Sequence, residues 1–284
     1  MIKNILFATD FSKNAENALP FAIDITRRSK GVLSLLHVFE TQPMAPVNIF
    51  TSRQETESLA AESMRSAAMA RLDKIAEDHL EGIQYRCITE EGAVHEGITK
   101  AVLKNEISLL VMGTQGQTAE RGLFMGSVTK GIIKNSACPV LAIPEKANFT
   151  SISTIVYATD LHRDESHVVD YLIRFAKLYD ATVVIMHIDH EESEKQWSLD
   201  KLHEIIDATD YGRIAYKEII AEDVSNGINA YIDERQPDVI AMTRNTHTLF
   251  DSISHSSLTK EMLMHTDIPL LAFSRKEFDT IFLG

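Results

Sequence analysis

A glycine-bearing loop behind an apolar run has the residue types that bind phosphate. Residues 113–127 read GTQGQTAERGLFMGS and follow the apolar run SLLVM. Glycines stand at 113, 116 and 126, and Ser127 follows the last of them. Glycine lets backbone N–H groups approach an anion, and a helix starting near Ser127 offers unpaired N–H groups and the positive end of its dipole. The loop is therefore a candidate phosphate site, although a lone GxxG also occurs in ordinary strand-to-helix turns.

Length and composition favour a folded protein of two ordinary domains. The chain has 284 residues, of which 44% are hydrophobic, enough for two cores. No run reaches the roughly 18 apolar residues that a membrane helix needs, and the opening MIKNILFATD is unlike a signal peptide because its short apolar part ends in an acid. We therefore expect a cytoplasmic protein. Cys87 and Cys138, the two cysteines of the chain, are expected to be reduced packing residues.

The chain repeats itself. KNILFATD at 3–10 is echoed by STIVYATD at 153–160, and LLHV by IMHI, at an offset of 150 residues. SLLVMG then matches DVIAMT, and PVLAI matches PLLAF, at an offset of 130 residues. The second copy has therefore lost 20 residues between its second and fourth strands. The repeat predicts two domains, residues 1–146 and 151–284.

Each repeat alternates β-branched runs with amphipathic stretches, which is typical of a parallel sheet with crossover helices. The expected strands are 2–9, 32–38, 83–89, 108–112, 139–143, 153–158, 182–188, 214–219, 238–242 and 268–273. The expected helices are 13–29, 54–80, 93–104, 127–136, 164–179, 198–208, 223–234 and 256–265. The Ala- and Met-rich helix 54–80 is expected to turn its apolar stripe toward the core. Ligands of such sheets gather at the carboxyl ends of strands, where Asp10, Val38 and Gly113 stand.

Three features together resemble the universal stress protein family: ATD ending the first strand, HV ending the second, and G-x2-G-x9-G-S before a helix and the run PVLAI. The resemblance covers both halves. It implies an α/β fold of two tandem Rossmann-like (adenine nucleotide alpha hydrolase-like) domains, each a five-stranded parallel sheet of order 3-2-1-4-5 flanked by helices. It also implies that the edge strands PVLAI and PLLAF pair as an intramolecular pseudo-dimer. The sequence leaves open whether two chains form a homodimer.

The resemblance implies an ATP site, because some members of that family bind nucleotide. By position, Asp10 would lie near the ribose or the Mg²⁺ that accompanies the phosphates, and the backbone of Val38 would meet the adenine edge. Gly113 and Gly116 would pass beneath the ribose and the phosphates. The residues capping the phosphates would be Gly126, Ser127, Val128 and Thr129.

Several of these positions admit a second interpretation. Asp10 also suits the N-cap of the following helix, and His37 in its apolar strand suits a hydrogen-bonded core histidine. Gln117 stands where many nucleotide-binding members of the family carry a basic residue. Either Arg121 or Lys130 would supply the missing charge, or both lie on the solvated surface. A loop before the helix at 54–80, TQPMAPVNIFTS, is expected to cover the adenine side.

The second repeat departs from the glycine pattern, with Thr243, Thr246 and Ser256 at the corresponding positions. Residues 147–284 hold 12 Lys and Arg against 24 Asp and Glu, whereas residues 1–146 hold 16 against 17. The acidic half is unfavourable for an anion such as ATP, so we expect one nucleotide site per chain. The acidic surplus also disfavours nucleic acid and anionic membrane as partners.

Histidines in the second repeat raise the question of a metal. A divalent cation could be held by residues among His187, His190, His247, His255, Asp160 and Asp251. Their spacing matches no metal-binding motif, so scattered surface histidines are the simpler interpretation.

Two classes of function fit these residues. The one we favour is an ATP-binding stress-response module, in which ATP orders the loop 114–126 and alters association with an unidentified protein partner. The other is an enzyme, a slow ATPase or a protein that phosphorylates itself on Ser127 or Thr129; the chain offers it no Walker lysine and no evident general base. The Gln117 departure also allows a protein that binds no ATP and acts only through protein contacts.

Overall fold

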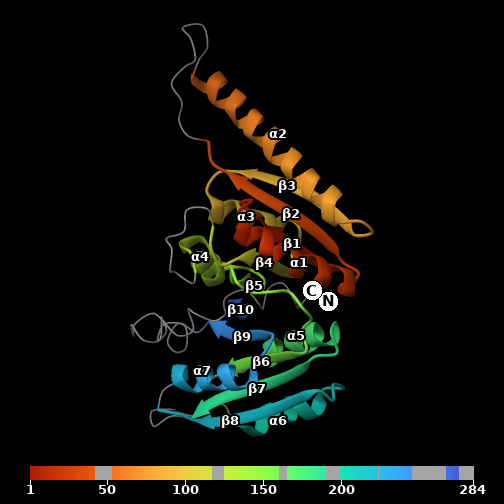
Figure 1. The fold of residues 1–284 in the computed structure, drawn as a ribbon, viewed down its shortest axis with the longest axis vertical. Coiled ribbons are helices and arrows are strands. Elements are labelled where there is room, and N and C mark those ends of the chain that lie inside the picture. The colour runs from red at the N-terminus through yellow and green to blue at the C-terminus, as the bar shows by residue number, and fades with distance from the viewer. Residues whose placement is uncertain are drawn as a thin grey trace.

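The computed structural model describes residues 1–41, 53–116, 125–159, 165–189, 199–222, 224–244 and 267–274 (Figure 1). The first half contains β1 (Asn4–Ala8), α1 (Lys13–Ser29), β2 (Val32–Phe39), α2 (Arg53–His79), β3 (Gln84–Glu91), α3 (Val94–Lys104), β4 (Leu109–Gly113), α4 (Ser127–Asn135) and β5 (Val140–Ile143). The second contains β6 (Thr154–Thr159), α5 (Ser166–Lys177), β7 (Thr182–Asp189), α6 (Leu199–Ala208), β8 (Ile214–Ile220), α7 (Val224–Arg235), β9 (Val239–Arg244) and β10 (Leu270–Ser274). The helix expected at 256–265 lies outside the described residues.

All the described strands join one sheet, in the order β3-β2-β1-β4-β5-β10-β9-β6-β7-β8. Within each half the strands run parallel in the expected order 3-2-1-4-5, which confirms the predicted fold. Successive side chains of a strand point to opposite faces, so Ile5 and Phe7 pack on the face covered by α1, α2, α5 and α6, while Leu6 and Ala8 pack under α3, α4 and α7. Burial on both faces explains the continuous apolar runs.

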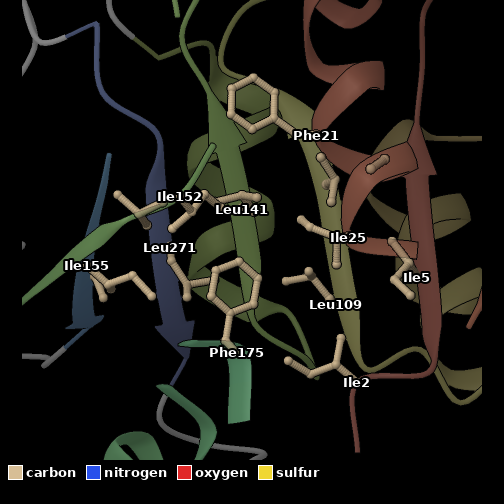
Figure 2. Packing of buried hydrophobic residues seen from close by; sticks show 14 of the residues in the cluster. Ile2, Ile5, Phe21, Ile25, Leu109, Leu141, Ile152, Ile155, Phe175 and Leu271 are labelled. Atoms are coloured by element: carbon tan, nitrogen blue, oxygen red, sulfur yellow. The ribbon is translucent and has the colours of Figure 1, made fainter. Parts of the chain in front are cut away.

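The two halves meet through the antiparallel pairing of β5 with β10, in which Leu141 lies opposite Leu271. Both side chains are buried, and Figure 2 shows them side by side with Phe175 of α5 next to them. The expected pairing of the two edge strands is thus confirmed. It removes two open sheet edges and gives the halves a shared core.

Helix α2 departs from the expectation that its whole apolar stripe faces the core. Its second half does so through Ala68, Leu72 and Ala76, but Leu59 is 68% exposed and Met64 41% exposed. The reason is length: at about 1.5 Å per residue the helix runs roughly 40 Å, whereas the 8-residue strand beside it spans about 26 Å. The first turns of α2 therefore reach past the sheet (Figure 1).

The described helices and the two cysteines bear on two further predictions. None of the described helices is both long enough and apolar enough to cross a membrane. Both cysteines are free thiols, as expected, and Cys138 is buried.

The linker between the halves is held by one side chain of α1. Asn17 Nδ2 lies 3.1 Å from the carbonyl oxygen of Pro144, 3.2 Å from that of Glu145 and 2.7 Å from that of Ala147. An amide that donates to the carbonyls of one segment holds that segment against the helix, and loss of the amide removes donors from part-buried acceptors, those of Pro144 and Ala147.

We expect Asn17→Ala to lower the free energy of unfolding by about 1–2 kcal/mol, because the linker carbonyls lose their donor. Urea denaturation followed by circular dichroism measures the change. Asn135→Ala is the matched control, since Asn135 Nδ2 bonds only the carbonyl of Gly131 in its own helix, at 3.1 Å, among the described residues. Equal losses in the two variants would contradict a special role for Asn17.

Candidate functional site

The candidate site lies where β1 and β4 end. Phe7 pairs with Val111 and Ala8 with Met112, so these two strands finish side by side. Strand β2 lies on the other side of β1, and the chain therefore reverses its winding direction here, which is where ligands bind in open parallel sheets.

The structure brings Asp10 and Gly116 together, although they are far apart in the sequence. A Cβ atom on Gly116 would lie 2.8 Å from Asp10 Oδ2. That distance is too short for a real contact, so glycine at this position lets the loop pass directly beside the carboxylate.

Asp10 does not cap the following helix, and that interpretation is wrong. Ser12 is the N-cap of α1, and its hydroxyl accepts the N–H of Ala15 at 3.2 Å. Asp10 stands two residues earlier, where its Oδ1 accepts the N–H of Ser12 at 3.0 Å. This turn fixes the carboxylate with Oδ2 facing Gly116.

Gly113 is required by the packing of α1 on the sheet. A Cβ atom there would lie 3.0 Å from Asn14 Cγ and 3.1 Å from the backbone oxygen of Asn14. Asn14 is buried, and its Nδ2 donates to the carbonyl of Gln115 at 3.0 Å. The sequence analysis missed Asn14, yet a signal existed: it is a polar residue on the buried stripe that continues through Ala18 and Ile25.

Gly126 differs, because nothing in the described residues requires glycine there. Its φ of −67° and ψ of 163° suit any residue, and an added Cβ would meet the carbonyl oxygen of Thr114 at an ordinary 3.5 Å. Its N–H donates to that same carbonyl at 2.7 Å. Gly126 is the N-cap of α4 and supplies no side-chain cap.

The first turn of α4 presents backbone donors. The N–H groups of Ser127, Val128 and Thr129 have no acceptor within the helix, because the first N–H groups of any helix lack one. The Thr129 side chain is buried, and its hydroxyl lies 3.1 Å from the carbonyl of Gly113 and 3.2 Å from that of Thr114. This hydroxyl fastens the first turn of α4 to the end of β4.

Of the two basic residues that could supply charge to the site, the structure describes Lys130. Lys130 is exposed one turn into α4. Gln117 and Arg121 lie outside the described residues, as does most of the loop expected over the adenine side.

Val38 is the next-to-last residue of β2, and its backbone groups are directed past the end of β1. The carbonyl of Leu36 accepts the N–H of Thr9 at 2.9 Å, so the polar backbone groups of Leu36 face β1. Backbone polar groups alternate in direction along a strand, so the N–H and C=O of Val38 point to the same side as those of Leu36. At Val38 they lie beyond Ala8, where β1 ends. The Val38 side chain packs against Gly97 of α3, where a Cβ would lie 2.7 Å from Val38 Cγ1.

His37 is a hydrogen-bonded histidine, as its second interpretation predicted. Its Nδ1 lies 2.8 Å from the carbonyl oxygen of Thr9, to which the ring donates. Burial is the main effect on its pKa and lowers it; the Thr9 carbonyl raises the pKa, the Arg71 charge lowers it, and the Asp10 carboxylate raises it, with a net decrease. His37 is therefore neutral near pH 7.

Side chains of the second half bond to each other where the first half has glycine. Thr243 stands at the position of Gly113, and its Oγ1 lies 2.7 Å from the Tyr157 hydroxyl. Thr159 donates to the buried carboxylate of Glu165 at 2.5 Å. In the described part of the second half, the polar side chains at these strand ends are therefore paired with each other.

Of the residues considered as metal ligands in the second half, His187 lies in the described part of the chain. His187 is buried, and its Nδ1 lies 3.1 Å from the carbonyl of Thr159. Within the described ranges, no group of three or more His, Cys, Asp or Glu residues is placed to hold a metal ion. The remaining candidates, with the two other degenerate positions, lie outside the described residues: Asp160, His190, Thr246, His247, Asp251, His255 and Ser256.

Comparison with known proteins gives the same family for both halves. A model of the universal stress protein family matches residues 1–144 and 151–274. A universal stress protein of Methanocaldococcus jannaschii is 29% identical over 157 residues, covering 51% of this chain and 97% of that protein. One from Synechocystis is 20% identical over 302 aligned positions, covering 96% and 100%. The crystal structure of one from Archaeoglobus fulgidus has the same fold, with a TM-score of 0.69, 18% identity and coverage of 97% and 99%.

Gly113 and Gly126 predict different effects of substitution on stability. Gly113→Ala should lower the free energy of unfolding by about 1–3 kcal/mol, because the new methyl group collides with the Asn14 backbone. Gly126→Ala should change it by no more than about 0.5 kcal/mol, since the backbone angles and the space suit alanine. Urea denaturation of the two variants tests this, and a loss at 126 as large as that at 113 would refute the assignment.

His37 predicts a dependence of stability on pH. Its folded pKa lies below the ordinary value of 6.5, so the unfolded chain takes up a proton first as the pH falls, and the stability given by neutral His37 is lost below about pH 6.5. His37→Asn keeps a donor near the Nδ1 position and cannot be protonated. Between about pH 7.5 and pH 5.5 the wild type should lose more stability than this variant in urea denaturation; parallel curves would contradict the pKa direction.

Proposed function

Because this chain belongs to the universal stress protein family, we propose that its first half, residues 1–146, is a domain that binds one ATP with Mg²⁺. The bound nucleotide then regulates association with a protein partner. Residues 151–284 form the second domain, which binds no nucleotide.

The observation that carries the proposal is the unneeded glycine at position 126. An N-cap side chain normally lies beside the N–H groups of the second and third helical residues. Neither the backbone conformation nor packing against the described residues calls for glycine at 126, and its lack of a side chain leaves the N–H groups of Val128 and Thr129 without a side-chain cap. A helix N-terminus with open donors and a positive dipole end binds phosphate.

The remaining residues suit the other parts of the ligand. Asp10 is held by the N–H of Ser12 and turns its Oδ2 toward the loop at Gly116, where a carboxylate would meet the ribose or share Mg²⁺ with the phosphates. The outward backbone groups of Val38 offer one donor and one acceptor, which is the pattern that the adenine edge requires. Ser127 is exposed and adds a hydroxyl beside the first turn of α4.

A regulatory role is favoured over an enzymatic one by the surroundings of the two hydroxyls. The Thr129 hydroxyl is buried and bonded to two carbonyls, so it is a poor acceptor for a phosphoryl group, whereas Ser127 is exposed. Asp10 is the carboxylate beside the loop, and binding of a metal ion would leave it a weak base. The protein would hold ATP without rapid turnover.

The second half supports a single site per chain. Thr243 stands at the position of Gly113 and is bonded to Tyr157, so the close backbone approach that glycine permits in the first half is not available there. The surplus of acidic residues in 147–284 further disfavours a polyphosphate there.

We expect Gly126→Val to weaken MgATP binding at least about tenfold, about 1.4 kcal/mol, because the side chain lies over the donors of α4. Isothermal titration calorimetry should give about one site per chain in the wild type. Gly212→Val is the control: Gly212 is exposed, and no atom lies within 4 Å of an added Cβ. Loss of affinity in both variants, or no binding by the wild type, would overturn the proposal. Phosphate release well above background that disappears in Asp10→Ala would instead support the enzyme.

A further inference from the structure

Phe11 adopts a backbone conformation that bulky residues rarely use. Its φ is +61°, in the left-handed region. The other described non-glycine residues with positive φ are Lys30, Glu106, Asp180 and Gln236. Each of those follows the end of a helix, where left-handed residues are common. Phe11 instead follows a strand and sits directly beside Asp10.

The conformation of Phe11 is fixed by contacts from three elements. Its N–H donates to Thr9 Oγ1 at 2.9 Å. Its ring contacts the Arg71 guanidinium of α2, 3.8 Å from the ring centroid, and the His37 ring of β2, whose centroid is 4.4 Å away. His37 is itself held by the Thr9 carbonyl. Strained residues persist only where the surroundings determine them in this way, and they concentrate at functional sites.

The left-handed turn at Phe11 sets the direction of its neighbour. Asp10 accepts the N–H of Ser12 across the turn at Phe11, and this bond holds the carboxylate with Oδ2 facing Gly116. We propose that Phe11 is a positioning residue for Asp10, and that the stack of Arg71, Phe11 and His37 clamps it in place. The inference rests on the proposed nucleotide site and adds that α2 supports that site through Arg71.

Glycine and alanine at position 11 separate positioning from packing. Both remove the ring, but glycine adopts positive φ freely, whereas alanine does so at a cost. Positioning predicts that Phe11→Ala weakens MgATP binding about tenfold while Phe11→Gly stays within about threefold of the wild type. A packing role predicts that both variants lose affinity, with glycine losing at least as much.

Two arginines on α2 provide the matched comparison. Arg71→Met removes the charge over Phe11 and should weaken MgATP binding a few-fold. Arg65→Met removes a cation of the same helix that pairs with Glu91 at 3.6 Å and should leave affinity unchanged. Equal effects of the two substitutions would overturn the role of Arg71.

A second readout separates failure of this inference from failure of the nucleotide proposal. Hydrogen exchange of the Ser12 amide, measured by NMR without ligand, reports the bond to Asp10 directly. Its protection should fall at least about tenfold in Phe11→Ala and stay near the wild-type value in Phe11→Gly. If the wild type binds no MgATP, the nucleotide proposal fails, and this order of protection still decides the positioning role. Equal loss of protection in the two variants would refute it.

Discussion

The parallel pairing of β1 with β4 is the constraint on which the candidate site depends. It makes two strands from distant parts of the sequence end together, with Ala8 opposite Met112. The chain leaving β1 and the chain leaving β4 must then pass each other within a few ångströms. Asp10 and Gly116 meet at that crossing, and the start of α4 is tied to it by Thr129. A slip of this register would separate the acid, the loop and the helix donors together.

The three glycines of the loop are alike in the sequence but not in the structure. Gly113 permits the close approach of α1, Gly116 permits the approach of a carboxylate, and Gly126 is demanded neither by its conformation nor by packing against the residues that the structure describes. Glycine spacing alone cannot separate these cases, because the atoms that crowd positions 113 and 116 come from residues about a hundred positions earlier. A glycine without a structural reason is the one that points to a ligand.

The sequence predicted the elements well, because alternating and continuous apolar runs directly reflect burial on a sheet. The pairing of PVLAI with PLLAF was also predictable, through the family resemblance. The alternative interpretation of Asp10 as the cap of α1 was wrong: Asp10 and Ser12 are both good capping residues, and the hydrogen bond from the Ala15 N–H identifies Ser12 as the cap. The left-handed Phe11 carries no sequence signal, since its conformation is imposed by residues of β2 and α2. For α2, periodicity marked an apolar face but could not show that the sheet beneath it ends first.

Because the two repeats share one core, the second repeat can lose the loop glycines and still stabilise the first. β5 and β10 pair through their backbones, and the cluster around Leu141 and Leu271 includes side chains of both halves. Stabilising this shared core needs apolar side chains in the second half but no ligand. Thr243 and Tyr157 can therefore bond to each other without harm to the first half. The second half also contacts α4: Ser274 Oγ of β10 lies 3.5 Å from the carbonyl of Lys134, near the carboxyl end of that helix. The half that lacks the loop glycines thus still contacts the helix proposed to bind phosphate.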